Sequence, residues 1–364
     1  MCRQSGISDY TQFELALRGE RVKLVTEHYT TTEDVLSWQP GTHRLSDTWV
    51  PIAHSKKIAL QPIRRAVHGQ PYYLLRDRKR NLLAKEFHPE QFRAMKKHAS
   101  EYTAGSGQYP VVERYGFAWV WYGEPANANE ALIPEIPFIS ATRGAPDYAS
   151  LSNYFHCSYE LVLENILDMT HIDFVHGNYG GTHESELDTV KVESTSESVT
   201  MIRTTLKRPT SEYQRNVLKV RDKYQDVHFF THVFIRSGLC ILHAHFSAAP
   251  SMPLMQNNAP ESRFLTRADT TFGTDACDDI YYRRNWPKTG PMIAAQDESV
   301  LNPQNPRYLF EQQPSEASSR FDSAGFAFRK RFRALVNRQR AGDFSYQGDF
   351  AKAKNVGQVL KNLP

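Results

Sequence analysis

The chain has 364 residues, and its 44 Lys and Arg against 40 Asp and Glu give a net charge of +4 with the two signs interspersed. This balance argues against a nucleic-acid-binding arm and a polybasic membrane patch. The four cysteines lie far apart, which excludes a disulfide scaffold and a metal site built from closely paired cysteines. The N-terminus lacks an apolar segment and no window approaches ~18 apolar residues, so we expect a cytoplasmic protein.

The first part of the chain predicts a small β domain. Residues 1–45 are polar and predict an extension, with a possible helix over Tyr10–Arg18. The stretch Phe87–Gly107 has no strand signal, and a Pro-rich connector over Gly123–Pro146 places the end of this domain, residues 46–150, near residue 150. Short β-branched or aromatic runs predict its strands, which are Thr48–Ala53, Pro71–Leu75, Asn81–Ala84 and Gly116–Tyr122.

Residues 151–364 predict a second domain, in which helices flank a curved antiparallel sheet. A helical pattern runs over Tyr159–Phe174, and Gly177 follows as a stop signal. Two further helices are expected, over Trp286–Val300 and, as an amphipathic helix packed on the core, over Phe326–Arg340. Alternating residues predict the strands Val199–Thr205, His228–Arg236, Cys240–Phe246 and Arg263–Thr270. The layout is that of a two-domain α+β protein.

The segment Glu164–His176 holds two histidines and several carboxylates, a donor set that suits a transition metal. On an ideal helix Asp168 and His171 lie about 60° apart, whereas His171 and His176 lie about 140° apart. Both histidines reach one ion only if the helix ends or widens between them, and Gly177 is a natural residue just past a helix end. On spacing alone, a helix with one buried and one solvated histidine is favoured over a metal site.

The same segment resembles the E-N-x-x-D-x-x-H-x-x-x-x-H signature of the catalytic subunits of Rieske-type non-haem iron oxygenases, and every fixed position matches. The resemblance implies a helix-grip catalytic domain in which His171 and His176 bind a mononuclear Fe(II). Asp168 matches the family's bridging aspartate, which links an iron-binding histidine to the cluster of a neighbouring subunit. Asn165 matches a pocket residue near the iron. The alternative for Asp168 is an exposed helix carboxylate.

The third ligand of the family is a carboxylate on a later helix, and the resemblance makes Asp297 the preferred residue. Gln296 stands where the family has an acid, and Asn302 with Pro303 replaces the expected helical continuation. These departures keep three other carboxylates as candidates, which are Asp278, Asp279 and Glu298. Three protein ligands leave positions open for O2, the co-substrate.

The resemblance extends to the first domain but not to its cofactor. The segments Asp47–His54, Leu75–Arg78 and Tyr109–Trp121 are similar to the strands and turn of a Rieske domain. A Rieske [2Fe–2S] cluster needs two cysteines and two histidines, yet no cysteine occurs from Arg3 to His156. We therefore expect a degenerate Rieske-like domain without the cluster, as in cluster-less N-demethylase components. Electrons would come from a Rieske centre on a separate protein or from a reductase.

Two functions remain in competition. The favoured one is a terminal oxygenase component that hydroxylates a small organic molecule, aromatic or heterocyclic, or removes an N- or O-methyl group from it. The alternative is a non-catalytic structural or regulatory subunit, and a helix-grip binding protein with an empty site is a third possibility. Because electrons cross between subunits in this family, we expect a homotrimer or a mixed assembly with a cluster-bearing homologue.

Four further histidines fall on two predicted strands. Period two places the members of each pair on one side of the sheet. They could line the substrate cavity or form a second metal site, but histidines satisfied by their neighbours are the favoured interpretation. The pairs are His228 with His232 and His243 with His245.

Overall fold

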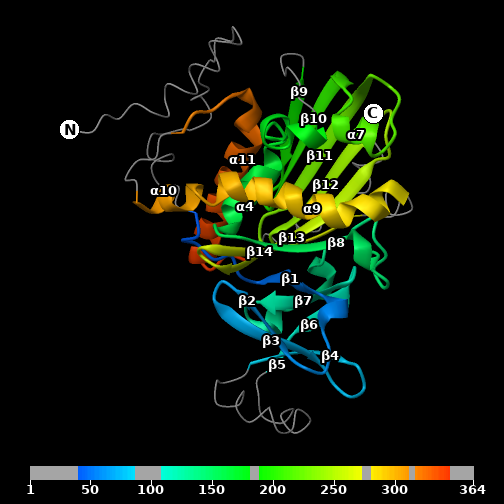
Figure 1. Cartoon of the computed structure of the whole chain (residues 1–364). Helices are drawn as coiled ribbons and strands as arrows, with labels where there is room; N and C mark the ends of the chain where they lie inside the picture. The colour runs from blue at the N-terminus through cyan, green and yellow to red at the C-terminus, as the bar shows by residue number, and fades with distance from the viewer. Residues whose placement is uncertain (1–39, 87–107, 181–187, 273–279, 311–315, 345–364) are drawn as a thin grey trace, which may run out of the picture.

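The computed structural model describes residues 40–86, 108–180, 188–272, 280–310 and 316–344. Its strands form three antiparallel sheets of three, four and seven strands, and helices cover one face of the largest sheet (Figure 1). This arrangement confirms the predicted α+β class. The possible helix at Tyr10–Arg18 and the stretch Phe87–Gly107 lie outside the described residues.

The two smaller sheets follow the N-terminal extension and have the strand orders β1-β7-β6 and β2-β3-β4-β5. Side chains of both sheets, including Ile52, Leu74 and Val120, form one buried cluster, because alternate residues of a strand point to the same face. The strands are β1 (Thr48–His54), β2 (Ile63–Val67), β3 (Gln70–Arg76), β4 (Leu82–Lys85), β5 (Gln108–Tyr109), β6 (Val111–Arg114) and β7 (Phe117–Tyr122).

The predicted strands in this region are all present, with slightly shifted ends. The sequence analysis does not predict β2, because Arg64 and Arg65 interrupt its short apolar pattern. Strands β4 and β5 pair through Ala84 with Tyr109 and through Lys85 with Gln108. The two ends of the stretch 87–107 are therefore held side by side.

The seven-stranded sheet has the order β8-β14-β13-β12-β11-β10-β9. The four predicted strands correspond to β10, β11, β12 and β14. Strand β13 escapes prediction because Pro253, Pro260 and a run of polar residues break its pattern, but β12 and β14 pair with it on both sides. The bounds are β8 (Ser150–Phe155), β9 (Thr189–Ser194), β10 (Ser198–Pro209), β11 (Tyr224–Phe234), β12 (Leu239–Phe246), β13 (Met252–Ser262) and β14 (Leu265–Phe272). The sheet begins at Ser150, and the domain boundaries at 45 and 150 stay predictions.

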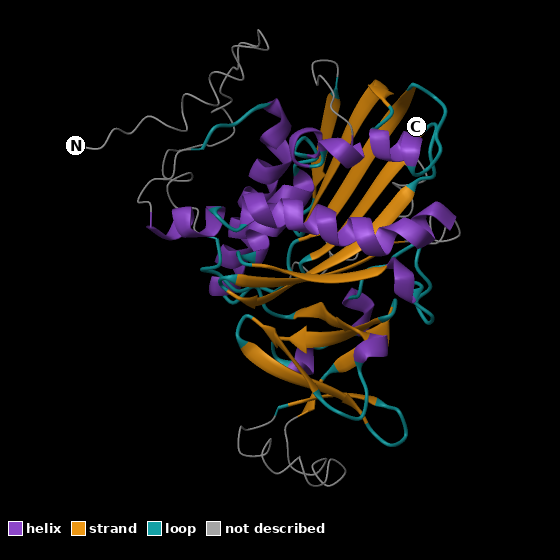
Figure 2. Ribbon diagram, viewed as in Figure 1, coloured by secondary structure: helices purple, strands orange, loops and turns teal. Residues whose placement is uncertain are grey.

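Three helices lie against one face of this sheet (Figure 2). They are α4 (Tyr159–Leu167), α9 (Ile280–Leu301) and α11 (Ser323–Arg340). Helix α4 contacts β11 to β14, α11 packs on β9 and β10, and α9 packs on β8. The shorter helices are α5 (Ile172–Val175), α6 (Gly177–Gly180), α7 (Glu212–Asn216) and α10 (Gln304–Phe310), and the 3-10 turns are η1 (Ser55–Lys57), η2 (Pro125–Asn127), η3 (Glu130–Leu132), η4 (Asp147–Ala149) and η6 (Arg320–Asp322).

The two faces of the large sheet carry different cores. On the helical face, Phe229 and Val233 of β11 are buried with Leu163 of α4 and Phe328 of α11. On the other face, Phe230 and Phe234 join the tryptophans of β1 and β7 in a second cluster. This second cluster fixes the small sheets to the large one.

The prediction of one helix over Tyr159–Phe174 is wrong, because α4 ends at Leu167. In a continuous helix the Met169 carbonyl would accept the Asp173 N–H. Here it accepts instead from the Arg203 guanidinium at 2.7 Å, and the Asp173 N–H donates to Thr170. The Asp168 carboxylate accepts the Thr170 N–H at 2.9 Å, an alternative to helical pairing that Asp commonly offers. Gly177 follows His176, the C-cap of α5, and also begins α6.

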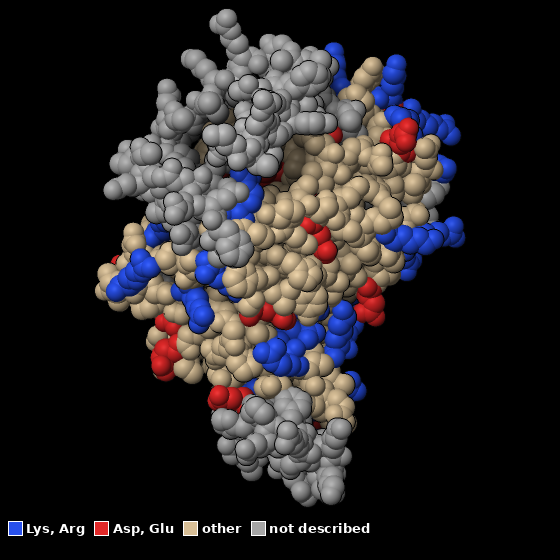
Figure 3. Space-filling view, turned by 60° about the vertical axis from the view of Figure 1, so that its left-hand side comes forward, with Lys and Arg blue, Asp and Glu red and all other residues tan. Residues whose placement is uncertain are grey.

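The predicted later helices are confirmed, and α9 begins earlier than expected, with Pro287 and Pro291 inside it. Helix α11 buries Phe328, Phe332 and Leu335 against the core, as its amphipathic pattern predicts. No helix in the described part of the chain is long and apolar enough to cross a membrane. Basic and acidic side chains are interspersed on the face that Figure 3 shows.

Candidate metal centre

Two histidines and one carboxylate converge beside the end of α4. His176 Nε2 lies 3.0 Å and His171 Nε2 3.4 Å from Asp297 Oδ1. Within the described residues, these three form the group whose ligand atoms, all within 4.8 Å of one another, could hold one metal ion. Their side chains are largely buried. The two histidines that spacing alone left 140° apart on a helix therefore meet, because the helix ends before His171.

Hydrogen bonds fix both imidazole rings. The Nδ1–H of His171 donates to the Asp168 carbonyl, and that of His176 donates to Gln296 Oε1 at 2.9 Å. A carbonyl oxygen can only accept, so Nδ1 carries a proton in each ring. Each Nε2 faces Asp297 and donates to it when the ring is protonated. When the rings are neutral, two lone pairs face the carboxylate oxygen instead, an arrangement that a cation satisfies. The donor set fits a divalent transition metal such as iron.

The electrostatics of the site also favour positive charge. Burial acts to raise the pKa of Asp297, but hydrogen bonds with His171 and His176 outweigh it and bring the pKa to about 2. Burial lowers the pKa of His171, and Asp297 more than reverses this, so the pKa is raised overall. Asn165 adds a hydrogen bond from its amide to Asp297 Oδ1 at 3.2 Å. The carboxylate is therefore held ionised and in one orientation.

A buried arginine holds the segment that carries the histidines. Arg203 of β10 is fully buried and donates to the Met169 carbonyl, to Asp173 at 2.6 Å and to Asp188 at 2.7 Å. Arg208 also contacts the Asp173 carboxylate. These bonds join α5, which lies between His171 and His176, to the central sheet. We call Arg203, Asp173 and Asp188 the clamp.

Helix α9 brings the third residue. Asp297 and Gln296 lie on it; Asp297 contacts both histidines and Gln296 contacts His176. Its neighbour Glu298 is directed elsewhere, with Oε1 accepting from Asn153 at 3.4 Å. Of the other candidates, Asp278 and Asp279 lie outside the described residues.

A cavity of about 210 Å³ opens beside the three residues. Its walls come from α4, α9 and strands β8 and β11 to β14. Most of the lining is apolar, with Leu242, Leu254, Phe246 and Ile293 as examples. A mostly apolar cavity with a few convergent polar groups is the usual form of a small-molecule site.

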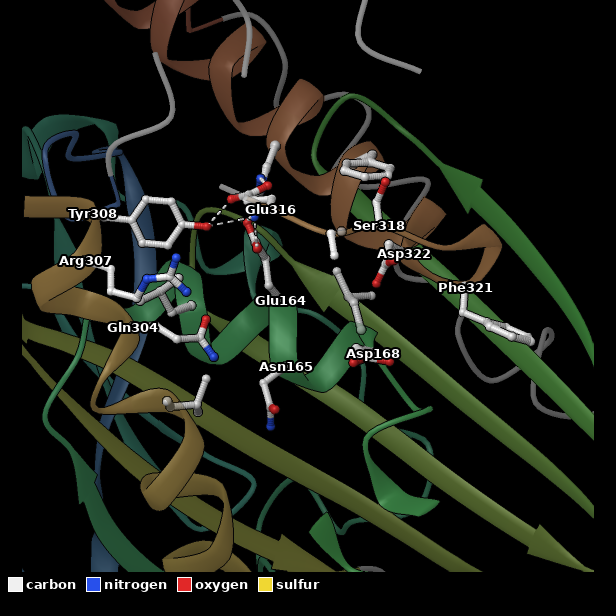
Figure 4. Close-up of a pocket in the computed structure, with 17 residues that line it drawn as sticks. Glu164, Asn165, Asp168, Gln304, Arg307, Tyr308, Glu316, Ser318, Phe321 and Asp322 are labelled. Carbon is white, nitrogen blue, oxygen red and sulfur yellow. Dashed lines mark hydrogen bonds and ion pairs between the residues drawn. The ribbon is translucent and has the colours of Figure 1, made fainter. Parts of the chain in front are cut away.

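A second cleft of about 430 Å³ lies against a different face of α4 (Figure 4). Glu164 and Asp168 of α4 line it together with Tyr308 and Arg329 from later helices. Arg329 binds both oxygens of Glu164 at 2.7 Å, which ties α11 to the helix that precedes the histidines. Asn165 lines both the cleft and the cavity, so α4 alone separates them there.

Three of the four strand histidines have a hydroxyl partner at Nδ1, as the favoured interpretation expects. The partners are Thr204 for His228 at 3.0 Å, Thr200 for His232 at 2.7 Å and Ser251 for His245 at 2.8 Å. The fourth, His243, lines the cavity. Burial lowers the pKa of His232 to about 3.

Sequence reasoning missed Gln296 and the clamp. Gln296 was counted as a departure from the family pattern, although its carbonyl oxygen is the hydrogen-bond partner of His176. A signal for Arg203 exists in the sequence, because it has the same strand parity as Val199 and Met201. An arginine on the buried face of a strand needs buried acids nearby.

The sequence comparisons identify the family. Residues 155–338, about half of the chain, match the family described as Vanillate O-demethylase oxygenase C-terminal domain. The vanillate O-demethylase oxygenase subunit of Pseudomonas sp. (strain HR199 / DSM 7063) is 35% identical over 112 residues, 30% of this chain and 28% of that protein. The dicamba O-demethylase oxygenase component of Stenotrophomonas maltophilia is 37% identical over 70 residues, 19% of this chain and 20% of that protein. The toluene-4-sulfonate monooxygenase system iron-sulfur subunit TsaM1 of Comamonas testosteroni is 37% identical over 76 residues, 20% of this chain and 21% of that protein. The matches span less than a third of each of these relatives.

Solved structures share the fold. Dicamba monooxygenase bound to 3,6-dichlorosalicylic acid has a TM-score of 0.66 at 15% identity and covers 81% of this chain and 98% of its own. Pseudomonas putida CBB5 NdmA with caffeine has a TM-score of 0.54 at 15% identity and covers 84% of this chain and 94% of its own. The family match includes the whole Glu164–His176 signature and Asp297. The chain therefore belongs to the vanillate O-demethylase oxygenase C-terminal domain family, among the Rieske-type oxygenases that its sequence resembles.

Proposed function

We propose that this chain is the terminal oxygenase component of a multi-component enzyme. His171, His176 and Asp297 would hold Fe(II), which would supply the O2 chemistry for hydroxylating a small organic substrate or removing an N- or O-methyl group from it. The observation that carries this proposal is the convergence of the three ligand atoms beside a largely apolar cavity. The names of the relatives, which are oxygenase subunits of demethylases and of a monooxygenase, support it.

The iron, when bound, would supply the activation of dioxygen that the amino acids cannot perform. The chain's own residues do the rest. The Asp168 carbonyl and the Gln296 amide hold the two imidazoles with Nε2 toward the site, and Asn165 orients the carboxylate of Asp297. The apolar walls of the cavity position the substrate and limit the access of water.

Electrons for the reaction come, in this proposal, from a Rieske centre on another protein. No cysteine occurs from Arg3 to His156, and two cysteines are needed in the Rieske domain for its cluster. Asp168 supports this route, because its carbonyl contacts His171 while its residue lines the outer cleft of Figure 4. A donor docked in that cleft would contact Asp168, whose carbonyl is hydrogen-bonded to His171. The assembly would be a homotrimer or a mixed oligomer with a cluster-bearing homologue.

Two measurements test the proposal without knowledge of the donor. Iron and acid-labile sulfide are measured first, on anaerobically purified and iron-loaded protein, and we expect iron without sulfide. Hydrogen peroxide then replaces O2 and the electrons, because it equals O2 plus two electrons and two protons. With 2-methoxyphenol as substrate, the expected products are catechol and formaldehyde.

The control for this experiment is the Asp297→Ala variant treated in the same way, together with free ferrous iron at equal concentration. Formaldehyde should form with the native chain and fall to the level of free iron in the variant. Absence of bound iron after reconstitution would favour the alternative, a non-catalytic structural or regulatory subunit. Sulfide at the level of a [2Fe–2S] cluster would contradict the need for an external Rieske donor.

A further inference from the structure

Several polar side chains that line the cavity beside the candidate iron site form hydrogen bonds within the protein. Thr270 Oγ1 donates to Gln256 Oε1 at 3.3 Å, and Gln256 Nε2 donates to Asn258 at 2.8 Å. The Asn153 amide donates to Glu298 and the Tyr179 hydroxyl contacts the Met292 sulfur at 3.5 Å. Hydrogen bonds within the protein thus occupy these four side chains, and a ligand gains little from displacing them. Trp286 Nε1, which is neutral, is a lining donor that is buried without a hydrogen-bond partner in the described part of the chain.

The charge of the lining is equally informative. No Lys or Arg is among the described residues that line the cavity, and Asp297 is the acid. A carboxylate or sulfonate buried here would find no Lys or Arg among the described lining residues to replace its hydration, and burying an unpaired charge is costly.

A bound ferrous ion would not offset the cost of burying an anion in this cavity. With Asp297 bound, it would contribute one net positive charge, but its open positions are those that O2 and water need. An anion that used the ion as its partner would occupy those positions. A substrate therefore has to be held by the walls, which are apolar side chains such as Leu242, Leu254, Phe246 and Ile293.

We propose that this cavity selects neutral, largely hydrocarbon molecules of about one substituted ring and discriminates against aromatic carboxylates and sulfonates. The volume of about 210 Å³ suits that size, since a dry apolar cavity of about 150 Å³ holds benzene. The relatives named for vanillate and toluene-4-sulfonate are named for anions, so this chain departs from them in substrate class. The inference rests on the proposed function for the identity of the site as a substrate site.

The experiment measures binding instead of turnover. Isothermal titration of anaerobic, iron-loaded protein at pH 8, where an unperturbed histidine is neutral, compares two pairs that differ only in the charged group. They are 2-methoxyphenol against vanillate and toluene against toluene-4-sulfonate. We expect the neutral member of each pair to bind about tenfold tighter or more. Equal or tighter binding of the anions, or no binding of either pair, would overturn the inference.

A charge-introducing variant gives an independent readout. Met252 lines the cavity at a half-exposed position, and Met252→Lys places a cation of similar length there. We expect Met252→Lys to reduce or reverse the difference in affinity between neutral and anionic ligands. The length-matched neutral variant Met252→Gln should keep that difference. Iron content measured on the same samples separates the two proposals. A neutral preference in protein that binds no iron would leave the selectivity intact while removing the oxygenase function.

Discussion

The molecule contains two groups of histidines that lie close together in the sequence but have different hydrogen-bond partners. His171 and His176 stand in a broken helical segment, and each donates from Nδ1 to a carbonyl oxygen. His228, His232 and His245 stand on β11 and β12, and each has a hydroxyl group at Nδ1. A hydroxyl can donate or accept, so it fixes neither the tautomer nor a free lone pair at Nε2.

The difference indicates why, in our proposal, the first pair and not the second group binds a metal. The first pair has an ionised carboxylate between the Nε2 atoms, whereas the rings of the second group neighbour one another, with 6.0 Å between the centroids of His228 and His245. Both groups hold imidazole rings close together. The first group differs because each Nδ1 donates to a carbonyl oxygen and a carboxylate faces the Nε2 atoms.

The largest effect is expected when residues of each group are replaced in turn and the bound iron is measured. We expect His171→Ala and Asp297→Ala to lose nearly all bound iron, from about one ion per chain, because each removes one of three protein ligands. His228→Ala and His245→Ala should keep the iron. The metal content of each purified variant, measured by mass spectrometry, checks this. Iron retained in Asp297→Ala alone would mean that another carboxylate is the ligand.

The clamp should matter more for stability than for the identity of the ligands. Arg203→Leu leaves Asp173 and Asp188 buried without this partner, and breaking such a buried network costs about 3–5 kcal/mol of unfolding free energy. Urea unfolding of the native chain and the variant measures the difference. Arg64→Leu, at an exposed position of β2, serves as the control and should change stability by less than about 0.5 kcal/mol. A similar loss of unfolding free energy in both variants would show that Arg203 stabilises the fold no more than an exposed arginine does.

Gln296 allows a finer test of the comparison, because its Oε1 accepts the hydrogen bond from His176 Nδ1. Gln296→Leu should weaken iron binding about 10–100-fold, the usual effect of removing the partner of a metal-binding histidine. Gln296→Glu keeps an acceptor and should retain the affinity. Competition with a chelator gives the dissociation constants. Glu298→Gln is the matched control on the same helix, and a loss of affinity there would point to Glu298 as a ligand.

The smallest effect concerns a histidine of the second group, and it appears only in acid. Burial lowers the pKa of His232 to about 3, so between that value and about 6.5 the unfolded chain binds more protons than the folded one. This contribution to stability is complete above pH 6.5 and is lost as the pH falls. His232→Gln should flatten the acid side of the stability profile by up to a few kcal/mol. Unfolding at a series of pH values tests it, with pH 7 to 8 as the range where the two profiles should run parallel.

Much of the fold could be predicted from periodicity, but the geometry of the site could not. The strands with clean alternation were predicted, while β13 was missed because its pairing partners, β12 and β14, lie outside any local pattern. The end of α4 was misplaced because it depends on Arg203, which lies 34 residues beyond the carbonyl that it binds. The family signature pointed to the histidines and to Asp297 as the preferred third ligand, whereas the contact of Gln296 with His176 appears only in the fold.

The pairing of β4 with β5 has a consequence for how this protein can change. Since Ala84 and Tyr109 are neighbours in the ladder, the connection between them can be replaced without altering the register of either strand. Loop length adds little to the free energy of closing such a connection. A cysteine-bearing insert between β4 and β5 could therefore be accepted or lost as a unit while the seven-stranded sheet and the candidate metal centre stay unchanged.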